Sequence, residues 1–197
     1  MKVLLISDRE MESLWEYYSP EKVKGVELII SCGDLKAVYL EFLVTMINKP
    51  LIYVHGNHDE SYVKHAPEGC VCIDDDVVEI NGLKIAGLGG SRRYRDGEFQ
   101  YTERQMAKRC RKLKKKIKKA GGIDVFVSHA PRAGYGDMED LPHQGFQCFA
   151  QFLEEVKPAY MFYGHVHKEY GNYPTSFSYN EGKTHIQNAY GYHIWDL

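Results

Sequence analysis

The chain has 197 residues, of which 44% are hydrophobic and 26% are charged, and its net charge is −2. These values are ordinary for a soluble globular protein and exclude a disordered or fibrous chain. The length predicts a single domain over residues 1–197 with a full hydrophobic core. Ten of the 25 basic residues fall between Arg104 and Lys119 with no acidic residue among them, so the rest of the chain sums to −12 (−2 minus 10). The chain is therefore an acidic body with one basic segment.

The cysteines and the N-terminal segment bear on the compartment. The five cysteines are odd in number and lack the spacing of a disulfide framework, which predicts reduced thiols and a cytoplasmic protein. The apolar run Val3–Ile6 is too short for a signal peptide, and no stretch approaches the length of a membrane span. We therefore expect no membrane partner, whereas no feature indicates an oligomeric state.

The first third of the chain alternates short apolar runs with segments of helical length. The runs are rich in Val, Ile, Leu or Tyr and each ends at a polar or glycine-containing loop, which is typical of buried strands. These predicted strands are Lys2–Ser7, Val26–Ser31 and Leu51–His55. Helices are predicted at Met11–Ser19 and Leu35–Asn48, because Pro20 and Pro50 lie just beyond their ends. This order implies parallel strands that are buried on both faces.

The rest of the chain mixes hairpins with further α/β units. Asn81 and Gly82 favour a type I′ turn, which predicts a hairpin from the two runs beside them. The predicted strands are Val77–Ile80, Leu83–Leu88, Asp124–Ser128, Ala159–Tyr163, Thr175–Tyr179, Thr184–Asn188 and Tyr192–Trp195, with helices at Arg104–Lys119 and Gly145–Val156. Parallel strands with late antiparallel hairpins predict two packed mixed sheets with helices outside, a four-layer α/β/β/α sandwich.

Polar residues follow five of the predicted strands, at the point where each strand ends. They are Asp8, Asp34, Asn57 with His58, His129, and His165 with His167. In α/β sheets the loops beyond the carboxyl ends of strands bind ligands. Any one of these residues could instead be an ordinary turn former or a surface residue. The conjunction of all of them at strand ends favours a metal site.

The residue types indicate which metals and which chemistry. Carboxylate oxygen and imidazole nitrogen suit Mn, Fe and Zn without a thiolate. Two such ions about 3.5–4 Å apart hold a phosphoryl group and lower the pKa of a bridging water, which gives hydroxide at neutral pH. A carboxylate shared between the ions, the role expected of Asp34, maintains that spacing. The sequence thus predicts two divalent ions and phosphoester hydrolysis.

The same motifs resemble those of the calcineurin-like metallophosphoesterase superfamily. The matching segments are Ser-Asp at 7–8, Cys-Gly-Asp at 32–34, Gly-Asn-His-Asp at 56–59, Ser-His-Ala-Pro at 128–131 and Gly-His-Val-His at 164–167. They stand in the order of the family and span most of the chain. The resemblance implies an α/β/β/α sandwich in which Asp8 and His167 bind the first metal and Asp34 bridges. It further implies that Asn57, His129 and His165 bind the second metal and that His58 contacts the phosphoryl group and protonates the leaving oxygen.

Two positions depart from the pattern of the family. The first motif of the family is Asp-x-His, whereas this chain has Glu10 where the histidine stands. Ligation by Glu10 makes the first site more anionic and favours Mn or Fe over Zn, and the alternative is that Glu10 points away and the site is weaker. Ala37 stands where many phosphatases of the family have an aspartate that orients the catalytic histidine. His58 therefore needs another partner or acts unassisted.

Two basic segments are candidates for substrate contact. The glycine-rich segment Gly87–Arg95 follows a strand and could present Arg92 or Arg93 to a phosphate, although such segments are often only turns. The helix Arg104–Lys119 has one narrow apolar stripe, and its lysine-rich remainder is either a solvated face or a surface that binds nucleic acid.

The leading hypothesis is a metal-dependent phosphoesterase that acts on a phosphodiester or a small phosphorylated metabolite. Two alternatives remain at this point. One is a binding scaffold that keeps the fold without the chemistry, and the other is a metal-dependent nuclease that binds nucleic acid through the helix Arg104–Lys119.

Overall fold

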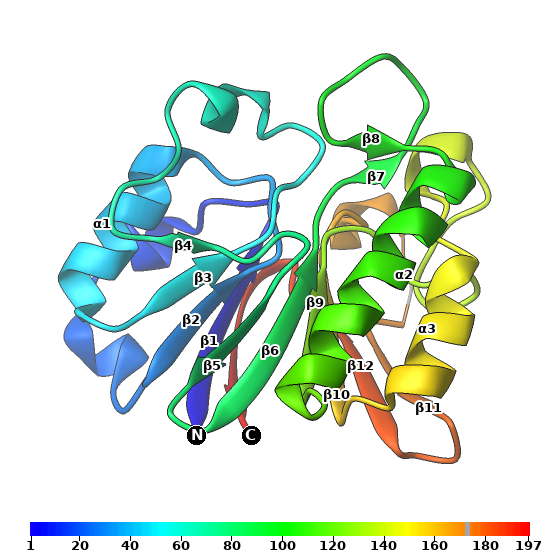
Figure 1. Cartoon of the computed structure of the whole chain (residues 1–197). Coiled ribbons are helices and arrows are strands. Elements are labelled where there is room, and N and C mark those ends of the chain that lie inside the picture. The colour runs from blue at the N-terminus through cyan, green and yellow to red at the C-terminus, as the bar shows by residue number, and fades with distance from the viewer. Residues whose placement is uncertain (172–173) are drawn as a thin grey trace.

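The computed structural model describes residues 1–171 and 174–197 and consists of two large mixed sheets with helices on their outer faces (Figure 1). The first sheet has the order β13-β1-β2-β3-β4. Its strands are β1 (Lys2–Ser7), β2 (Leu28–Ser31), β3 (Leu51–Tyr53), β4 (Val71–Cys72) and β13 (Gly191–Asp196). Strands β1 to β4 are parallel, and β13 pairs antiparallel with β1.

The second sheet has the order β11-β12-β10-β9-β6-β5. Its strands are β5 (Val77–Ile80), β6 (Leu83–Leu88), β9 (Val125–Ser128), β10 (Tyr160–Tyr163), β11 (Ser176–Tyr179) and β12 (Thr184–Asn188). The four central strands are parallel, and β5 and β11 are antiparallel edges. The hairpin predicted around Asn81 and Gly82 is present, with both residues at positive φ.

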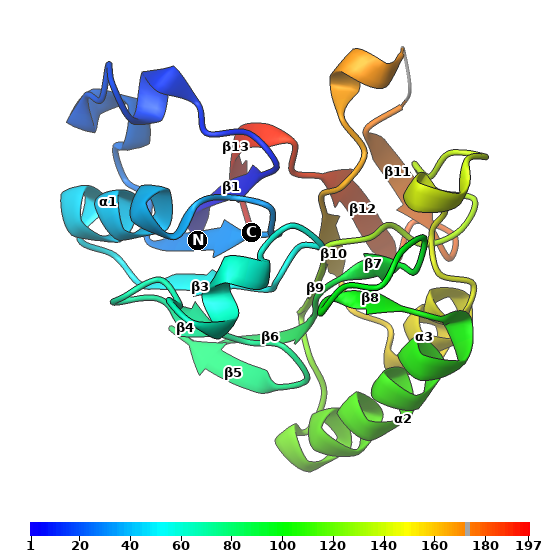
Figure 2. The same cartoon turned by 90° about the horizontal axis from the view of Figure 1, so that it is seen from above.

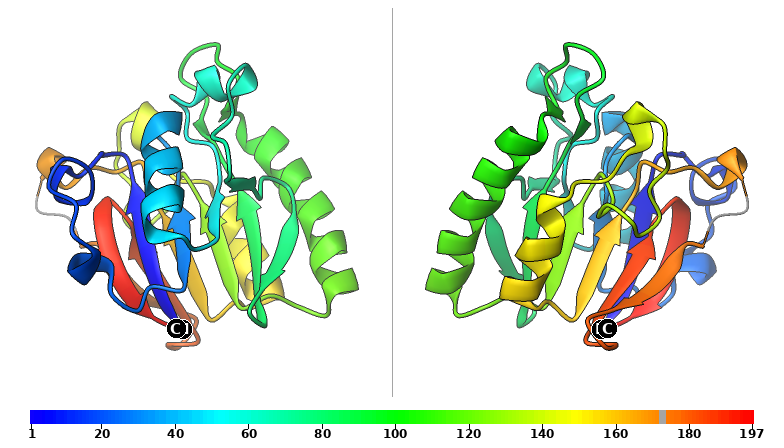
Figure 3. Two further views of the ribbon diagram at one scale, coloured as in Figure 1. Left: turned by 90° about the vertical axis from the view of Figure 1, so that its left-hand side faces the viewer. Right: turned by 90° about the vertical axis from the view of Figure 1, so that its right-hand side faces the viewer.

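The inner faces of the two sheets form one apolar layer. It joins Leu5, Ile30 and Ile52 of the first sheet to Val127 and Phe162 of the second, and all five side chains are buried. Helix α1 (Ala37–Ile47) covers the outer face of the first sheet, whereas α2 (Glu103–Ala120) and α3 (Cys148–Val156) cover the second (Figures 2 and 3). The predicted four-layer arrangement is therefore confirmed.

The basic segment forms helix α2, which has a defined cap at each end and one buried apolar stripe. Thr102 closes its N-terminus with a capping box to Gln105, and Gly121 ends it in the left-handed conformation. The buried stripe of α2 faces the aromatic core beneath α3. This stripe is made of Met106, Cys110, Leu113 and Ile117. None of the described helices is both long and apolar enough to cross a membrane.

One predicted element is wrong. Met11–Ser19 is not an α-helix, because only a 3₁₀ turn forms at Glu12–Leu14 and another begins at Pro20. Leu14 is the only buried side chain of the first turn, and Trp15 stacks on Tyr39 of α1 with ring centroids 5.1 Å apart. These tertiary contacts, and not a helical pattern within the segment, therefore determine its conformation. Short strands β7 (Ser91–Arg92) and β8 (Gln100–Tyr101) form a separate pair that the sequence analysis missed.

Candidate metal centre

The carboxyl ends of β1, β2, β3, β9 and β10 meet at one edge of the two sheets, the upper edge in Figure 1. A cavity of about 180 Å³ opens there. It is lined by Asp8, Asp34, Asn57, His58, Tyr94, Pro142, His143, His165, His167 and Tyr170. Six of the predicted site residues therefore share one cavity, and His129 is fully buried beside them.

Asp34, His129 and His165 lie closest together. They each offer a ligand atom, and these atoms lie within 4.8 Å of one another. The Nδ1 atom of His129 donates to the carbonyl of Cys32 at 2.7 Å, which directs its Nε2 atom toward the cluster. There Nε2 lies 3.1 Å from the Oδ1 atom of Asn57 and 3.3 Å from the Oδ2 atom of Asp34. A carbonyl that fixes the tautomer and orientation of a histidine is the usual support of a metal ligand.

His165 is oriented in the same way but through its other nitrogen. Its Nε2 atom donates to the carbonyl of Pro142 at 2.7 Å, so Nδ1 is left with a lone pair to bind an ion. The Oδ1 atom of Asp34 accepts the backbone N–H of His58 at 2.8 Å. The loops after β2, β3, β9 and β10 thus converge on a single point.

Asp8 and His167 form the other half of the centre. The Oδ2 atom of Asp8 accepts the backbone N–H of His165 at 2.8 Å, whereas Oδ1 is buried and has no hydrogen-bond partner in the described structure. The Nε2 atom of His167 lies 3.5 Å from that oxygen. An unsatisfied buried carboxylate oxygen costs free energy, and a cation there would satisfy it. The donor set fits a divalent metal.

The charged groups of the centre shift one another's pKa values. Burial alone would raise the pKa of Asp34, but the charge and hydrogen bond of His129 hold it at about 2. Burial alone would lower the pKa of His129, but Asp34 raises it to about 10. Burial and the charge of His129 together lower the pKa of His165 to about 4. A proton on His129 therefore neutralises the carboxylate that a metal would otherwise hold.

Backbone geometry explains the residue types that surround the ligands. Asp8, Asp34 and His165 all have positive φ (63°, 57° and 71°), a backbone conformation that residues other than glycine rarely adopt. A Cβ atom added at Gly56 would overlap the carboxylate of Asp34, and one at Gly164 would overlap Ser7. The motif glycines thus leave room for sharp turns that bring the ligands inward.

Asp59, the last residue of Gly-Asn-His-Asp, stabilises these turns by hydrogen bonds to their backbone. Its buried carboxylate accepts the backbone N–H groups of Gly56 at 2.6 Å and Asp34 at 2.9 Å. Burial and the charge of Asp34 raise its pKa to about 7. Asp59 thereby ties the loop after β3 to the loop after β2.

Glu10 lies outside the cavity wall. Its Oε1 atom accepts the backbone N–H of Lys36 at 3.1 Å, and Oε2 lies 3.7 Å from the ammonium group of Lys36. It lines a separate hollow with Glu12, Trp15 and Glu16. Ligation by Glu10 would require its carboxylate to leave Lys36, and it stays a prediction.

Arg92 and Arg93 are not in the cavity wall either. The guanidinium of Arg92 donates to Glu103 at 2.6 Å, and that of Arg93 lies 3.7 Å from Asp96. Tyr94, the next residue of the same loop, does line the cavity. The loop therefore reaches the cavity through Tyr94, and a phosphate contact by Arg92 or Arg93 stays a prediction.

His143 and Tyr170 were also missed. Tyr170 stacks on His167 with ring centroids 4.8 Å apart, and His143 lies 4.8 Å from Tyr170. Both come from 3₁₀ turns, Leu141–His143 and Lys168–Tyr170, that carry no recognisable motif. Their contribution depends on how these loops close over the strand ends.

A second cluster of possible ligands, His55, Cys72 and Asp74, lies beside the centre. The Nδ1 atom of His55 is 2.6 Å from Asp74, whose other oxygen accepts the backbone N–H of Gly89. Arg109 also lies 3.7 Å from this carboxylate. These contacts already satisfy Asp74, so we interpret the cluster as a link between β3 and the loop after β6.

Comparison with known proteins identifies the family. Residues 1–186 match the sequence profile described as the calcineurin-like phosphoesterase superfamily domain. The chain belongs to this superfamily. The predicted family is thereby confirmed, and its members generally use two divalent metal ions.

Individual relatives agree with this assignment. A lariat debranching enzyme of Arabidopsis thaliana is 28% identical over 193 residues, which cover 81% of this chain and 41% of that protein. A lariat debranching enzyme of Drosophila melanogaster is 28% identical over 205 residues, with coverage of 75% and 38%. The chain therefore spans roughly two fifths of the length of these relatives.

The fold has solved counterparts. The crystal structure of the protein TT1561 of Thermus thermophilus matches this chain with a TM-score of 0.67 at 16% identity, and the match covers 96% of this chain and 89% of that one. At this identity the likeness shows the fold alone.

Proposed function

We propose that this chain hydrolyses a phosphodiester or a small phosphomonoester with two divalent metal ions bound at the described centre. The observation that supports the proposal most is the convergence of Asp34, His129 and His165 beside the unsatisfied Oδ1 atom of Asp8. The similarity to lariat debranching enzymes favours a diester.

The proposed ligands divide into two sets around Asp34. Asp8 and His167 hold the first ion, because the Nε2 atom of His167 faces the free oxygen of Asp8. Asn57, His129 and His165 hold the second ion. When bound, the ions would neutralise charge on the phosphoryl group and lower the pKa of a water. Mn, Fe and Zn all fit these carboxylate, carboxamide and imidazole donors, and Mn or Fe would be favoured if Glu10 also ligated.

His58 is the proposed proton donor to the leaving oxygen. Its exposed side chain lies in the cavity wall, while its backbone N–H is held by Asp34. Ala37 begins helix α1 and offers no polar group, and the ring of His58 makes no hydrogen bond to any described residue. His58 would therefore act without an orienting carboxylate, which lowers its general-acid efficiency.

The test is metal content and turnover of the Mn-reconstituted protein. We expect two Mn²⁺ per chain and hydrolysis of bis-p-nitrophenyl phosphate, with p-nitrophenyl phosphate as the monoester probe. His58→Ala should lower kcat about 10²–10⁴-fold. His65→Ala, an exposed histidine outside the cavity, is the matched control.

Two results would contradict the proposal. Fewer than one metal ion per chain after reconstitution would favour a scaffold without chemistry. Full metal loading without turnover of either ester under Mn, Fe or Zn would exclude a phosphoesterase of these two classes.

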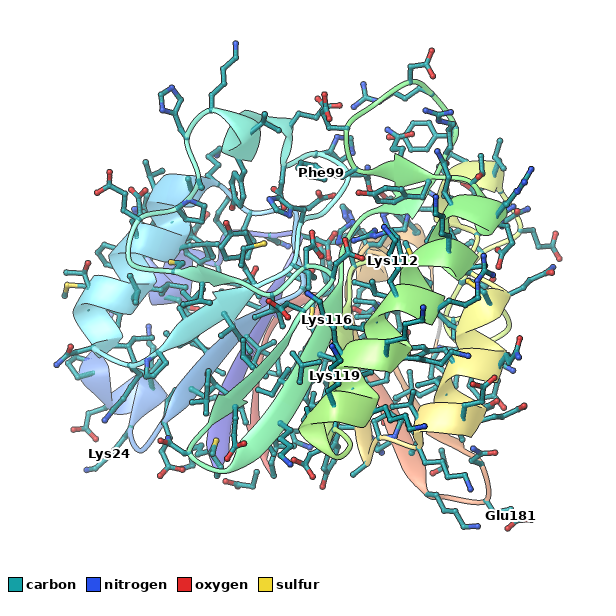
Figure 4. All side chains as sticks on the ribbon, viewed as in Figure 1. Lys24, Phe99, Lys112, Lys116, Lys119 and Glu181 are labelled. Atoms are coloured by element: carbon teal, nitrogen blue, oxygen red, sulfur yellow. The ribbon has the colours of Figure 1, made fainter. Side chains whose placement is uncertain are left out.

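A second candidate function, cleavage of nucleic acid, is favoured by the outer face of α2 (Figure 4). Seven basic residues there are exposed and form no ion pair within the described part of the chain. They are Arg104, Lys108, Arg111, Lys112, Lys115, Lys118 and Lys119. At 3.6 residues per turn they fall within an arc of about 120°, opposite the buried stripe. The basic residues on the flanks of this arc, such as Lys114 and Lys116, are paired with Glu155 and Asp76.

Salt dependence tests this candidate. A triple variant, Lys108→Gln with Arg111→Gln and Lys115→Gln, should reduce the slope of log affinity against log salt for a single-stranded RNA by about 2, since each phosphate contact contributes about 0.7. Turnover of bis-p-nitrophenyl phosphate should be unchanged. Equal slopes for the variant and the wild type would mean that the face is only solvated.

A further inference from the structure

Tyr94 enters the cavity from the loop between β7 and β8. The residues before it are held elsewhere, because Arg92 is paired with Glu103 and Arg93 lies near Asp96. Tyr94 thus provides the side chain through which this loop reaches the metal centre, since it lines the same cavity as Asp34 and His58.

The phenol oxygen of Tyr94 fixes one of the proposed ligands. The Nδ2 atom of Asn57 donates to this oxygen at 3.3 Å, and the Oδ1 atom of Asn57 faces the Nε2 atom of His129 at 3.1 Å. An amide has one acceptor side and one donor side, so engaging the donor side with Tyr94 keeps the oxygen turned toward the ligand cluster.

The hydroxyl of Tyr94 keeps its own hydrogen available. A phenol can accept one hydrogen bond and donate another. Its oxygen accepts from Asn57, and it donates to no acceptor within the described part of the chain. The cavity wall therefore contains a neutral donor directly beside the proposed second metal site.

The loop holds Tyr94 rigidly in this place. The backbone N–H groups of Tyr94 and Arg95 both donate to the Oε1 atom of Gln100 at 3.2 Å, and Gln100 is buried. The guanidinium of Arg95 lies 5.8 Å from the centre of the Tyr94 ring and 3.4 Å from Glu60. A donor that is already oriented before substrate binds contributes most to binding and catalysis.

We propose that Tyr94 is a substrate-contacting residue whose hydroxyl donates a hydrogen bond to a phosphoryl oxygen at the metal centre while it orients Asn57. This role rests on the proposed function, because it places the phosphoryl group beside Asn57. It assigns to Tyr94 the phosphate contact that the sequence suggested for Arg92 or Arg93.

The decisive variant is Tyr94→Phe, which removes the hydroxyl and keeps the ring. The affinity of the Mn²⁺-loaded, desalted protein for inorganic phosphate, measured by calorimetry, should fall about 10- to 100-fold. The kcat/KM for bis-p-nitrophenyl phosphate should fall by a similar factor. Tyr18→Phe is the matched control, since its hydroxyl donates to the carbonyl of Met46 outside the cavity.

The calorimetric readout separates three outcomes. Weaker phosphate binding with two Mn²⁺ still bound supports the contact. Alternatively, the variant could bind Mn²⁺ more weakly and recover full phosphate affinity when excess metal is added. That result would overturn the contact, because Tyr94 would then only position Asn57. Phosphate affinity within twofold of wild type would also overturn it. Absence of turnover in the wild type would refute the proposed function alone, because phosphate binding is measured independently.

Discussion

Loading the metal-free protein with Mn²⁺ at several pH values tests the charge state of His129. Burial opposes a charge on this imidazole, but Asp34, Asp8 and the carbonyl of Cys32 raise its pKa to about 10. A histidine ligates a metal only in its neutral form, so binding must displace this proton. Asp34, with a pKa of about 2, and His165, with a pKa of about 4, are already deprotonated at neutral pH.

The magnitude follows from this proton count. Below the pKa of His129, release of one proton makes metal affinity rise about tenfold per pH unit, or about 100-fold between pH 6.5 and 8.5. The adjacent carboxylate of Asp8 also raises the pKa of His167, so His167 adds to the protons that metal binding releases. The stability of the metal-free protein should change in the opposite direction. His129 has a folded pKa above its ordinary value of 6.5, so its contribution is complete below pH 6.5 and is lost toward pH 10.

Calorimetry in two buffers of different ionisation enthalpy measures the protons directly. We expect between one and two protons released per chain at pH 7. The variant His129→Asn should release fewer by about one, as it lacks the displaced proton. A wild-type affinity that does not change between pH 6.5 and 8.5, or no proton release at pH 7, would show that His129 is neutral before metal binds.

Three further predictions concern the centre and the core. Gly56→Ala should displace the carboxylate of Asp34, lower Mn²⁺ stoichiometry and destabilise the protein by about 1–3 kcal/mol in urea unfolding, and unchanged metal content would contradict the close approach. Glu10→Gln should retain two Mn²⁺ by elemental analysis, because Lys36 holds the carboxylate outside the cavity; loss of one ion would instead show that Glu10 ligates. Phe126→Ala should cost about 3–5 kcal/mol in the same unfolding assay, since this buried ring packs against α3, and a cost below about 1 kcal/mol would mean that the core collapses around the gap.

Much of the fold could be predicted because its strands are short, apolar and ended by polar or glycine residues. All the longer strands of both sheets were expected, as were α1, α2 and α3 within three residues of their starts. Met11–Ser19 failed for a tertiary reason. Trp15 stacks on Tyr39 and Phe42, contacts that periodicity within the segment cannot reveal.

The residues of the candidate site also differ in how well the sequence predicts them. Residues directly after strands, such as Asp34 and His165, could be predicted because parallel strands deliver their carboxyl ends to one edge. Tyr94 and His143 lie in longer loops, whose path depends on buried contacts such as Gln100 to the backbone of Tyr94. No local pattern encodes that path. The ion pair of Arg92 likewise depends on Glu103, which lies 11 residues further along the chain.

The strained backbone at the ligands links the fold to the chemistry. A residue other than glycine at positive φ costs about 1–2 kcal/mol, and Asp8, Asp34 and His165 all adopt it. Glycine at any of these positions would relieve that cost but would remove a ligand atom. The strain is tolerated because hydrogen bonds from neighbouring loops hold each of these turns. The backbone N–H of His165 donates to the carboxylate of Asp8, that of Asp34 donates to Asp59, and that of Asp8 donates to the carbonyl of Gly33. Neighbouring loops therefore hold these three turns before any metal arrives, and an ion at the proposed centre would add to an arrangement that already exists.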